Sequence, residues 1–169
     1  YDRGSRSGMV ARELLGCYHG IVQCDGYAAY EQFERMKGIT LVGCWAHVRR
    51  KYVDALEENR TLATQAIHYI GKLYKIESEG LTAEERKEKR ISEAYPLILE
   101  FEKWLQDTYL RVLPKSRMGK AIEYTYTLLP RLSRYVNDGR IEIDDNRIEN
   151  AIRPLALGRK NYLFCGNDA

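Results

Sequence analysis

The sequence predicts a mixed α/β fold in which a short sheet with packed helices is joined to a large array of antiparallel helices. Two observations lead to this class. Over the first 50 residues, short apolar runs alternate with helix-forming segments, which indicates a partly parallel sheet. Over residues 51–138, apolar residues instead recur at helical spacing, and turn residues separate the segments.

The first 50 residues predict two helices and two strands in alternation. We expect a helix over 10–15, a strand over 19–25, a second helix over 27–36 and a second strand over 39–44. Gly16 is a typical helix stop, and Lys37-Gly38 interrupts the second helix. The first strand ends in Asp25-Gly26, so this aspartate is expected at the carboxyl end of a buried strand.

The next segments carry recognisable helix signals. The pattern is helical over 46–80, and Thr82-Ala-Glu-Glu85 is a capping-box signature. The charge run from Glu84 to Arg90 is interpreted as a solvated face, and Pro96 as a kink or restart.

The final segments of the chain predict one more long helix and a return to the sheet. Ser116 is expected to cap a helix that Pro130 bends and Asp138-Gly139 closes. A brief extended piece follows at 141–143. Asp144, Asp145 or Asn146 is then expected to cap a last helix that reaches about residue 152.

Composition restricts the class of protein only loosely. Apolar residues make up 44% of the chain and charged residues 30%, as in ordinary globular proteins. The 27 Lys and Arg residues and 24 Asp and Glu residues give a net charge of +3, which does not by itself demand a nucleic-acid partner. Without a membrane-length apolar run or a signal peptide, we expect a cytoplasmic protein with no membrane partner. Four cysteines without a Cys-x-x-Cys pair indicate reduced thiols. Because the first residue is Tyr1, we expect part of a longer protein.

Two carboxylates and one Cys-x-x-His pair are candidates for chemistry. Taken alone, Asp25 is most simply an Asp-Gly turn, and Glu149 is most simply the ion-pair partner of Arg153 four residues later. Cys44 and His47 have metal-ligand spacing, but a tetrahedral zinc site needs four ligands and no second pair is evident. We therefore favour a structural interpretation, with Cys44 in the core and His47 hydrogen-bonded near the strand end.

Two groups of cations could contact phosphates, although each alone is typical of a solvated surface. The first comprises Arg49, Arg50 and Lys51. The second comprises Arg147, Arg153, Arg159 and Lys160. In the second group, Gly158 is followed by two cations, an amide and then apolar and aromatic residues, which suits a phosphate-contacting loop, with an ordinary helix exit as the alternative.

Together these features resemble the insertion-sequence-66 family of bacterial transposases. The order of the motifs agrees, and the resemblance covers nearly the whole chain. The motifs are Gln-Cys-Asp-Gly-Tyr-Ala-Ala-Tyr (23–30), Gly-Cys-Trp-Ala-His-Val-Arg-Arg-Lys-Tyr (43–52), Leu-Pro-Lys-Ser (113–116) and Asp-Asp-Asn-Arg-Ile-Glu-Asn-Ala-Ile-Arg-Pro-Leu-Ala-Leu-Gly-Arg-Lys-Asn-Tyr-Leu-Phe (144–164).

The resemblance implies a partial ribonuclease H-like fold with an Asp-Asp-Glu triad. Asp25 matches the second aspartate and Glu149 the glutamate. The implied organisation is a first core part (1–50), a helical insertion (51–138) and a return to the core (139–169).

The resemblance also implies DNA cleavage and strand transfer with Mg²⁺ or Mn²⁺ bound by these carboxylates. The first aspartate would lie upstream of this chain, so the fragment alone is expected to be inactive.

The other implied roles concern DNA and the surroundings of the triad. The DNA-contacting residues would be Arg49, Arg50, Lys51, Arg153, Arg159 and Lys160. Cys44 and His47 match a Cys-x-x-His element found after the second aspartate in several transposase families, and Asn146 belongs to the Asp-Asp-Asn motif before the glutamate. The expected partners are transposon-end and target DNA in the bacterial cytoplasm and nucleoid, with a homo-oligomer as a further expectation.

Two other functions remain open on the sequence. The chain could be a non-catalytic nucleic-acid-binding or oligomerisation module, including a degenerate transposon remnant. It could also be a zinc-stabilised helical protein that uses Cys44 and His47. Stoichiometric zinc would favour the latter, and a wide separation of Asp25 from Glu149 would exclude the catalytic assignment.

Overall fold

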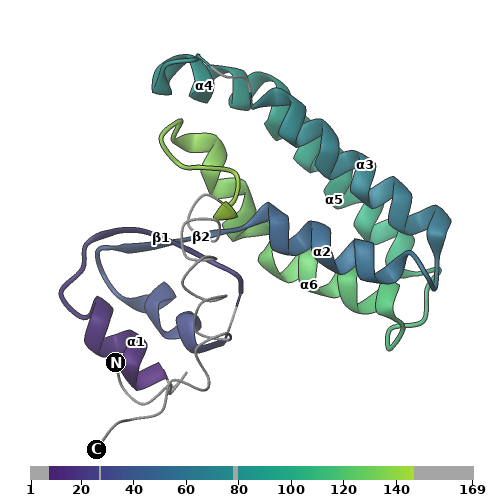
Figure 1. Cartoon of the computed structure of the whole chain (residues 1–169), viewed down its shortest axis with the longest axis horizontal. Helices are drawn as coiled ribbons and strands as arrows, with labels where there is room; N and C mark the ends of the chain where they lie inside the picture. The colour runs from purple at the N-terminus through teal and green to yellow at the C-terminus, as the bar shows by residue number, and fades with distance from the viewer. Residues whose placement is uncertain (1–7, 27, 78–79, 147–169) are drawn as a thin grey trace, which may run out of the picture.

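The computed structural model describes residues 8–26, 28–77 and 80–146. The chain folds into a small parallel strand pair with two short helices and a larger array of longer helices (Figure 1). The elements are α1 (Gly8–Leu15), β1 (Gly20–Cys24), the 3₁₀ helix η1 (Ala28–Arg35), β2 (Ile39–Gly43), α2 (Trp45–Ala55), α3 (Arg60–Ile76), α4 (Ala83–Lys89), the π-helical turn η2 (Arg90–Ala94), α5 (Tyr95–Tyr109), α6 (Arg117–Leu132) and the 3₁₀ helix η3 (Ser133–Asn137).

The two predicted strands form and pair in parallel. Their register runs from Gly20 opposite Ile39 to Cys24 opposite Gly43. Both strands therefore end at the same edge, which places the residues that follow them, Asp25 and Cys44, at that edge. This confirms the predicted α/β class, whereas the sheet, predicted to be only partly parallel, consists in the described residues of one parallel pair. The piece at 141–143 joins no sheet in the described part of the chain, where only two strands pair.

Strand β2 lies between two hydrophobic cores, because successive strand side chains point to opposite faces. Leu41 is fully buried in a small core with Cys24, Phe33 and Ile39. Val42, the next residue, is fully buried in the large core of the helical array. The small core is covered by η1, which has 3₁₀ geometry where the sequence predicted an α-helix.

The helical array is antiparallel, as predicted, and its polar cross-links show the directions of the helices. Between α3 and α5, the hydroxyl of Tyr69 donates to Glu100 and the indole of Trp104 donates to Gln65, both at 3.2 Å. Figure 1 shows α5 returning beside α3 after the chain turns back through α4. Beneath this pair, α2 packs on α6 and on α3.

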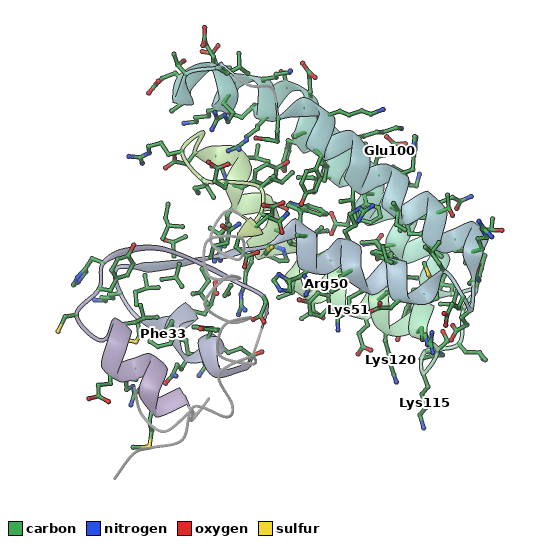
Figure 2. The ribbon with its side chains drawn as sticks, in the orientation of Figure 1. Phe33, Arg50, Lys51, Glu100, Lys115 and Lys120 are labelled. Carbon is green, nitrogen blue, oxygen red and sulfur yellow. The ribbon has the colours of Figure 1, made fainter. Side chains whose placement is uncertain are left out.

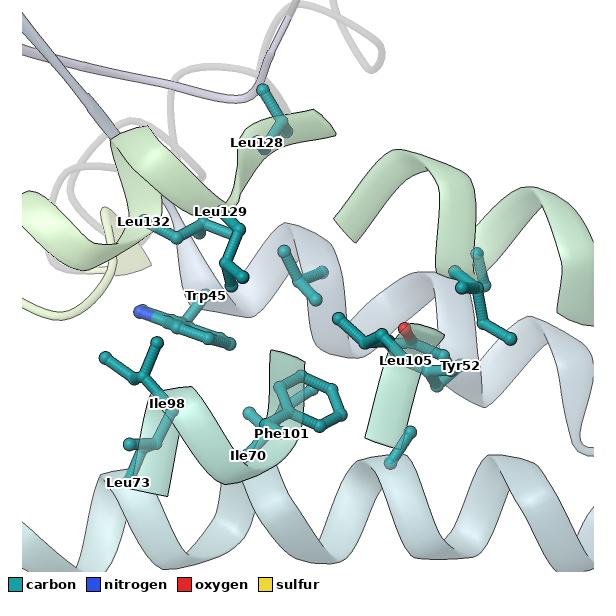
Figure 3. Packing of buried hydrophobic residues seen from close by; sticks show 14 of the residues in the cluster. Trp45, Tyr52, Ile70, Leu73, Ile98, Phe101, Leu105, Leu128, Leu129 and Leu132 are labelled. Atoms are coloured by element: carbon teal, nitrogen blue, oxygen red, sulfur yellow. The ribbon is translucent and has the colours of Figure 1, made fainter. Parts of the chain in front are cut away.

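The large core is centred on the aromatic ring of Phe101 in α5 (Figure 3). This ring stacks on Tyr69 and Trp104, with centroids 5.1 and 5.7 Å away. Trp45 and Tyr52 of α2 approach the same ring at 6.3 and 6.4 Å. Aromatic contacts of this kind add to the free energy of apolar burial, so α2, α3 and α5 are held at one centre.

Helix ends follow the predicted local signals in two places. Thr82 and Glu85 form the reciprocal capping box, and the Ser116 side chain accepts a hydrogen bond from the backbone N–H of Gly119. The stretch at 46–80 is largely helical, as its pattern indicated, but it forms two helices, because Asn59 starts a new one by accepting a hydrogen bond from the N–H of Leu62.

Arg90 corrects the interpretation of the charge run at 84–90. Its side chain is fully buried rather than solvated. It donates to both carboxylate oxygens of Glu77, at 2.9 and 2.6 Å, and to the carbonyls of Tyr135 and Asp138, both at 2.9 Å. These bonds join the end of α3 to η3.

Gly139 lies against the backbone of α4, so we predict that Gly139→Ala destabilises the fold. An added Cβ would lie 1.8 Å from the Ala83 carbonyl oxygen, and backbone must move to relieve this overlap. The expected loss is about 1–3 kcal/mol of unfolding free energy, measured by urea denaturation. Gly71→Ala is the matched control. It adds a Cβ in open space within α3 and is expected to be neutral or to stabilise by about 1 kcal/mol. Equal effects of the two substitutions would contradict the prediction.

Candidate functional site at the carboxyl edge of the sheet

Asp25 directly follows β1 and has an exposed side chain. Gly26 adopts φ +78°, so the predicted Asp-Gly turn does form. A Cβ added to Gly26 would lie only 2.6 Å from the Leu128 side chain of α6. The turn therefore lets α6 pack closely against this edge, while the Asp25 carboxylate stays open to solvent.

Tyr124 of α6 connects the helical array to Asp25. Its hydroxyl donates a hydrogen bond to the Asp25 carbonyl oxygen. Burial, followed by the electrostatic influence of Asp25 and then of Cys44, raises the pKa of Tyr124 to about 12. Asp25 and Cys44 thus lie within electrostatic range of one phenol, so the two strand ends share one environment.

A second group of side chains gathers where β2 passes into α2. Cys44, His47 and Asp145 each offer one ligand atom, and these atoms all lie within 4.8 Å of one another. The Cys44 thiol donates to Asp145 Oδ1 at 2.8 Å, and His47 Nδ1 lies 3.7 Å from the same oxygen. Burial, followed by the hydrogen bond to Asp145, raises the pKa of Cys44 to about 12. Cys44 is buried, whereas the side chains of His47 and Asp145 are 17% and 19% exposed.

The segment that carries Asp145 is attached to the sheet edge by its backbone. The Ile143 carbonyl accepts from the N–H of Trp45 at 3.2 Å. The Gln23 side chain donates to the carbonyls of Glu142 and Gly43, at 3.1 and 3.4 Å. Gln23 was not predicted as a site residue, although a polar residue inside an apolar strand was an available signal for it.

Asp144 and Asp145 have different partners, although both were interpreted as helix caps. Asp144 accepts from the backbone N–H of Asn146 at 3.0 Å, as a cap does, and from the Tyr74 hydroxyl at 2.7 Å. Asp145 instead faces Cys44 and His47. This role of Asp145 was not predicted, because Cys44 and Asp145 are 101 residues apart.

The cations of α2 lie beside this edge. Arg49 and Arg50 are exposed and line a hollow of about 490 Å³ together with Tyr74 and Asn146. The Lys51 amine lies 5.2 Å from the centroid of the Tyr124 ring. Figure 2 shows Arg50 and Lys51 on the same side of the molecule, away from Glu100.

A second hollow, of about 280 Å³, lies next to Gly26. Lys120, Tyr124 and Arg131 of α6 are among the residues that line it. Lys120 is exposed (Figure 2). These α6 cations were not predicted as site residues, because their local pattern is the same as that of an ordinary solvated helix face.

Part of the predicted site lies outside the described residues. Glu149, Arg153, Arg159 and Lys160 all belong to residues 147–169. The structure therefore brings together Asp25, Cys44, His47 and Asn146 at one edge with the cations of α2, and the separation of Asp25 from Glu149 stays a prediction.

These features define an α/β protein whose acidic and polar side chains gather at the carboxyl edge of parallel strands, where open α/β sheets commonly build their sites. Within this class, the family model described as "Transposase IS66 family" matches residues 1–169. The chain therefore belongs to the IS66 family of transposases, as its motifs suggested.

Three similar proteins come from Sinorhizobium fredii (strain NBRC 101917 / NGR234). Uncharacterized protein y4qI is 37% identical over 99% of this chain, y4jD is 34% identical over 96%, and y4hP is 28% identical over 99%. The aligned regions cover 33–34% of these relatives, so the chain spans about a third of their length. No solved structure matches the chain. Within residues 8–26, 28–77 and 80–146, no helix has the length and apolar character required to cross a membrane.

Proposed function

We propose that this chain forms part of the catalytic domain of a DNA transposase, which cleaves and joins phosphodiester bonds with the help of Mg²⁺ or Mn²⁺. The observation that carries the proposal is the position of Asp25. Asp25 is exposed and directly follows a parallel strand. It lies at the same sheet edge from which α2, the helix that carries Arg49, Arg50 and Lys51, begins. In this proposal Asp25 is the second aspartate of the triad and Glu149 is the glutamate.

A ribonuclease H-like core interrupted by a helical insertion accounts for the chain's topology. The helical array leaves the sheet edge at Trp45 and the chain returns there at Ile143, where the two residues share a backbone hydrogen bond. The segment just before Glu149 is therefore attached to the edge that carries Asp25. This return supports the placement of Glu149 near Asp25, and the division at 50 and 138 stays a prediction.

The donor chemistry distinguishes where Mg²⁺ or Mn²⁺ would bind. These ions prefer hard oxygen ligands and keep several waters. The exposed carboxylate of Asp25 fits this preference, and Glu149 would add a second one. The neighbouring group of Cys44, His47 and Asp145 contains sulfur and nitrogen and fits Mg²⁺ poorly. When bound, the metal would supply activation of the attacking oxygen and stabilisation of the leaving oxygen.

The remaining residues of the site would bind and orient DNA. Arg49 and Arg50 can contact phosphates at the hollow beside Asn146, and Lys51 can do so beside Tyr124. Tyr124 would hold the Asp25 backbone, and hence the carboxylate, in place through its hydrogen bond to the Asp25 carbonyl. Homo-oligomerisation stays an expectation.

The proposal is tested by DNA cleavage with a full-length protein that carries this sequence. Labelled DNA containing the ends of the element is incubated with Mg²⁺, with Mn²⁺, or with EDTA. We expect nicking or joining products with either metal and none with EDTA. DNA binding without products under every metal condition would favour a non-catalytic binding module.

A further inference from the structure

We propose that Cys44, His47 and Asp145 form a zinc site that attaches the start of α2 to the segment preceding Glu149. This site is separate from the carboxylates assigned to Mg²⁺, and the inference does not depend on the proposed transposase activity. The sequence offered only one Cys-x-x-His pair. The structure adds a third ligand from a position 101 residues away from Cys44.

The three donors are of the types that zinc prefers. Zinc binds thiolate, imidazole and carboxylate with bonds of about 2.0–2.3 Å, which places donors of a tetrahedral site about 3.5 Å apart. The Nδ1 to Oδ1 distance, 3.7 Å, is close to this value, the Sγ to Oδ1 distance, 2.8 Å, is shorter, and all three ligand atoms lie within 4.8 Å of one another. Side-chain shifts of less than about 1 Å would therefore bring these donors to the spacing of a tetrahedral site, and a water would complete the tetrahedron.

The backbone around the three residues holds them in place before any metal binds. Cys44 lies between β2 and α2 as the N-cap residue of α2, and His47 lies in the first turn of that helix, so regular structure holds both. Asp145 is held by the hydrogen bond between Trp45 and Ile143 and by the bonds of Gln23. The neighbouring Asp144 is turned away to Tyr74 and Asn146, which leaves Asp145 as the carboxylate of the cluster.

Zinc binding would exchange one bond for another at the cysteine. The Cys44 thiol, which donates to Asp145, loses its proton to solvent and forms the Sγ–Zn bond. Asp145 and His47 then ligate through Oδ1 and Nδ1. The metal would close the loop of chain between Cys44 and Asp145, and it would fix the start of the segment that leads to Glu149.

The test is metal analysis of the 169-residue chain purified with zinc and then desalted. We expect about one zinc per chain. Substitution by Co²⁺ should give the intense visible bands of tetrahedral cobalt and a thiolate charge-transfer band in the near ultraviolet. Zinc affinity is measured by competition with a chromophoric chelator and should fall on the order of 100-fold or more in Cys44→Ser, His47→Ala and Asp145→Asn. Replacing even a residue that only hydrogen-bonds to a metal ligand typically lowers metal affinity about 10–100-fold.

Matched controls separate ligation from other effects. Cys17→Ser replaces an exposed cysteine and His68→Gln an exposed histidine, and both should keep the zinc affinity of the unsubstituted chain. Asp25→Asn should also keep it, so the zinc site can fail or succeed independently of the proposed activity. Asp145→Asn is the decisive variant because asparagine preserves size and can still accept the thiol hydrogen bond. No bound zinc, or unchanged affinity in Asp145→Asn, would overturn the proposal in favour of a hydrogen-bonded junction.

Discussion

Replacing Asp25 by asparagine is expected to reduce DNA cleavage by the full-length protein on the order of 10³-fold while leaving its stability unchanged. A carboxylate that binds a catalytic metal contributes several kcal/mol to the stabilisation of the transition state, and each 1.36 kcal/mol corresponds to about a tenfold change in rate. Asparagine keeps the size of the side chain and loses its charge. Since Asp25 is exposed, and the hydrogen bond that it accepts from Tyr124 uses the backbone carbonyl, the fold should tolerate the change.

The measurement is the single-turnover rate of strand cleavage with Mg²⁺, together with the thermal midpoint of each variant. Asp54→Asn is the matched control, because Asp54 is an exposed aspartate on α2 outside the site. It should cleave at the unsubstituted rate. Glu149→Gln should match Asp25→Asn if the two carboxylates act together. Cleavage within a few-fold of normal in Asp25→Asn would rule out its assignment as the second aspartate.

Replacing Arg90 by methionine is expected to lower the unfolding free energy by about 3–5 kcal/mol, the usual effect of breaking a buried ion pair from one side. The guanidinium is fully buried and satisfies four acceptor atoms, on Glu77, Tyr135 and Asp138. It also lies 4.7 Å from the centroid of the Tyr135 ring. Methionine fills much of the volume but donates no hydrogen bond, so the Glu77 carboxylate loses its counterion and two carbonyls lose their donor.

This loss should appear as a decrease of about 10 °C in the thermal midpoint of a chain of this size. Arg90→Lys keeps the charge but cannot reach all four acceptors in a fixed plane, so an intermediate loss is expected. Lys87→Ala, on the exposed face of α4, is the control and should change stability by no more than about 0.5 kcal/mol.

A double-mutant cycle tests whether Arg90 and Glu77 act as a pair. Adding Glu77→Gln to Arg90→Met removes the carboxylate left without its counterion. The double variant should therefore lose less stability than the sum of the two single losses. Strict additivity would show that Arg90 and Glu77 are not coupled. A loss below about 1 kcal/mol for Arg90→Met would show that the buried hydrogen bonds of Arg90 contribute little to stability.

Local features of the chain were predictable because their causes lie within a few residues. The strands at 20–24 and 39–43 followed from short apolar runs, and the Thr82 and Ser116 caps from hydrogen bonds that span three residues. Asp25 was placed at a strand end by the same reasoning. The 3₁₀ geometry of η1 and the break before Asn59 were not predicted, because helical spacing alone does not specify which carbonyl each N–H selects.

The sequence by itself determined the α/β class, the family motifs and the position of Asp25 on a strand end. The tertiary structure decided which distant residues meet. Gln23 reaches Glu142 across 119 residues, Cys44 reaches Asp145 across 101, and Arg90 reaches Tyr135 across 45. A charged or polar residue has the same local pattern whether it faces water or a distant partner. The packing of the helical array on the sheet edge therefore decides that Arg50 is exposed and Arg90 is buried. The same packing adds Asp145 to the Cys44 and His47 pair.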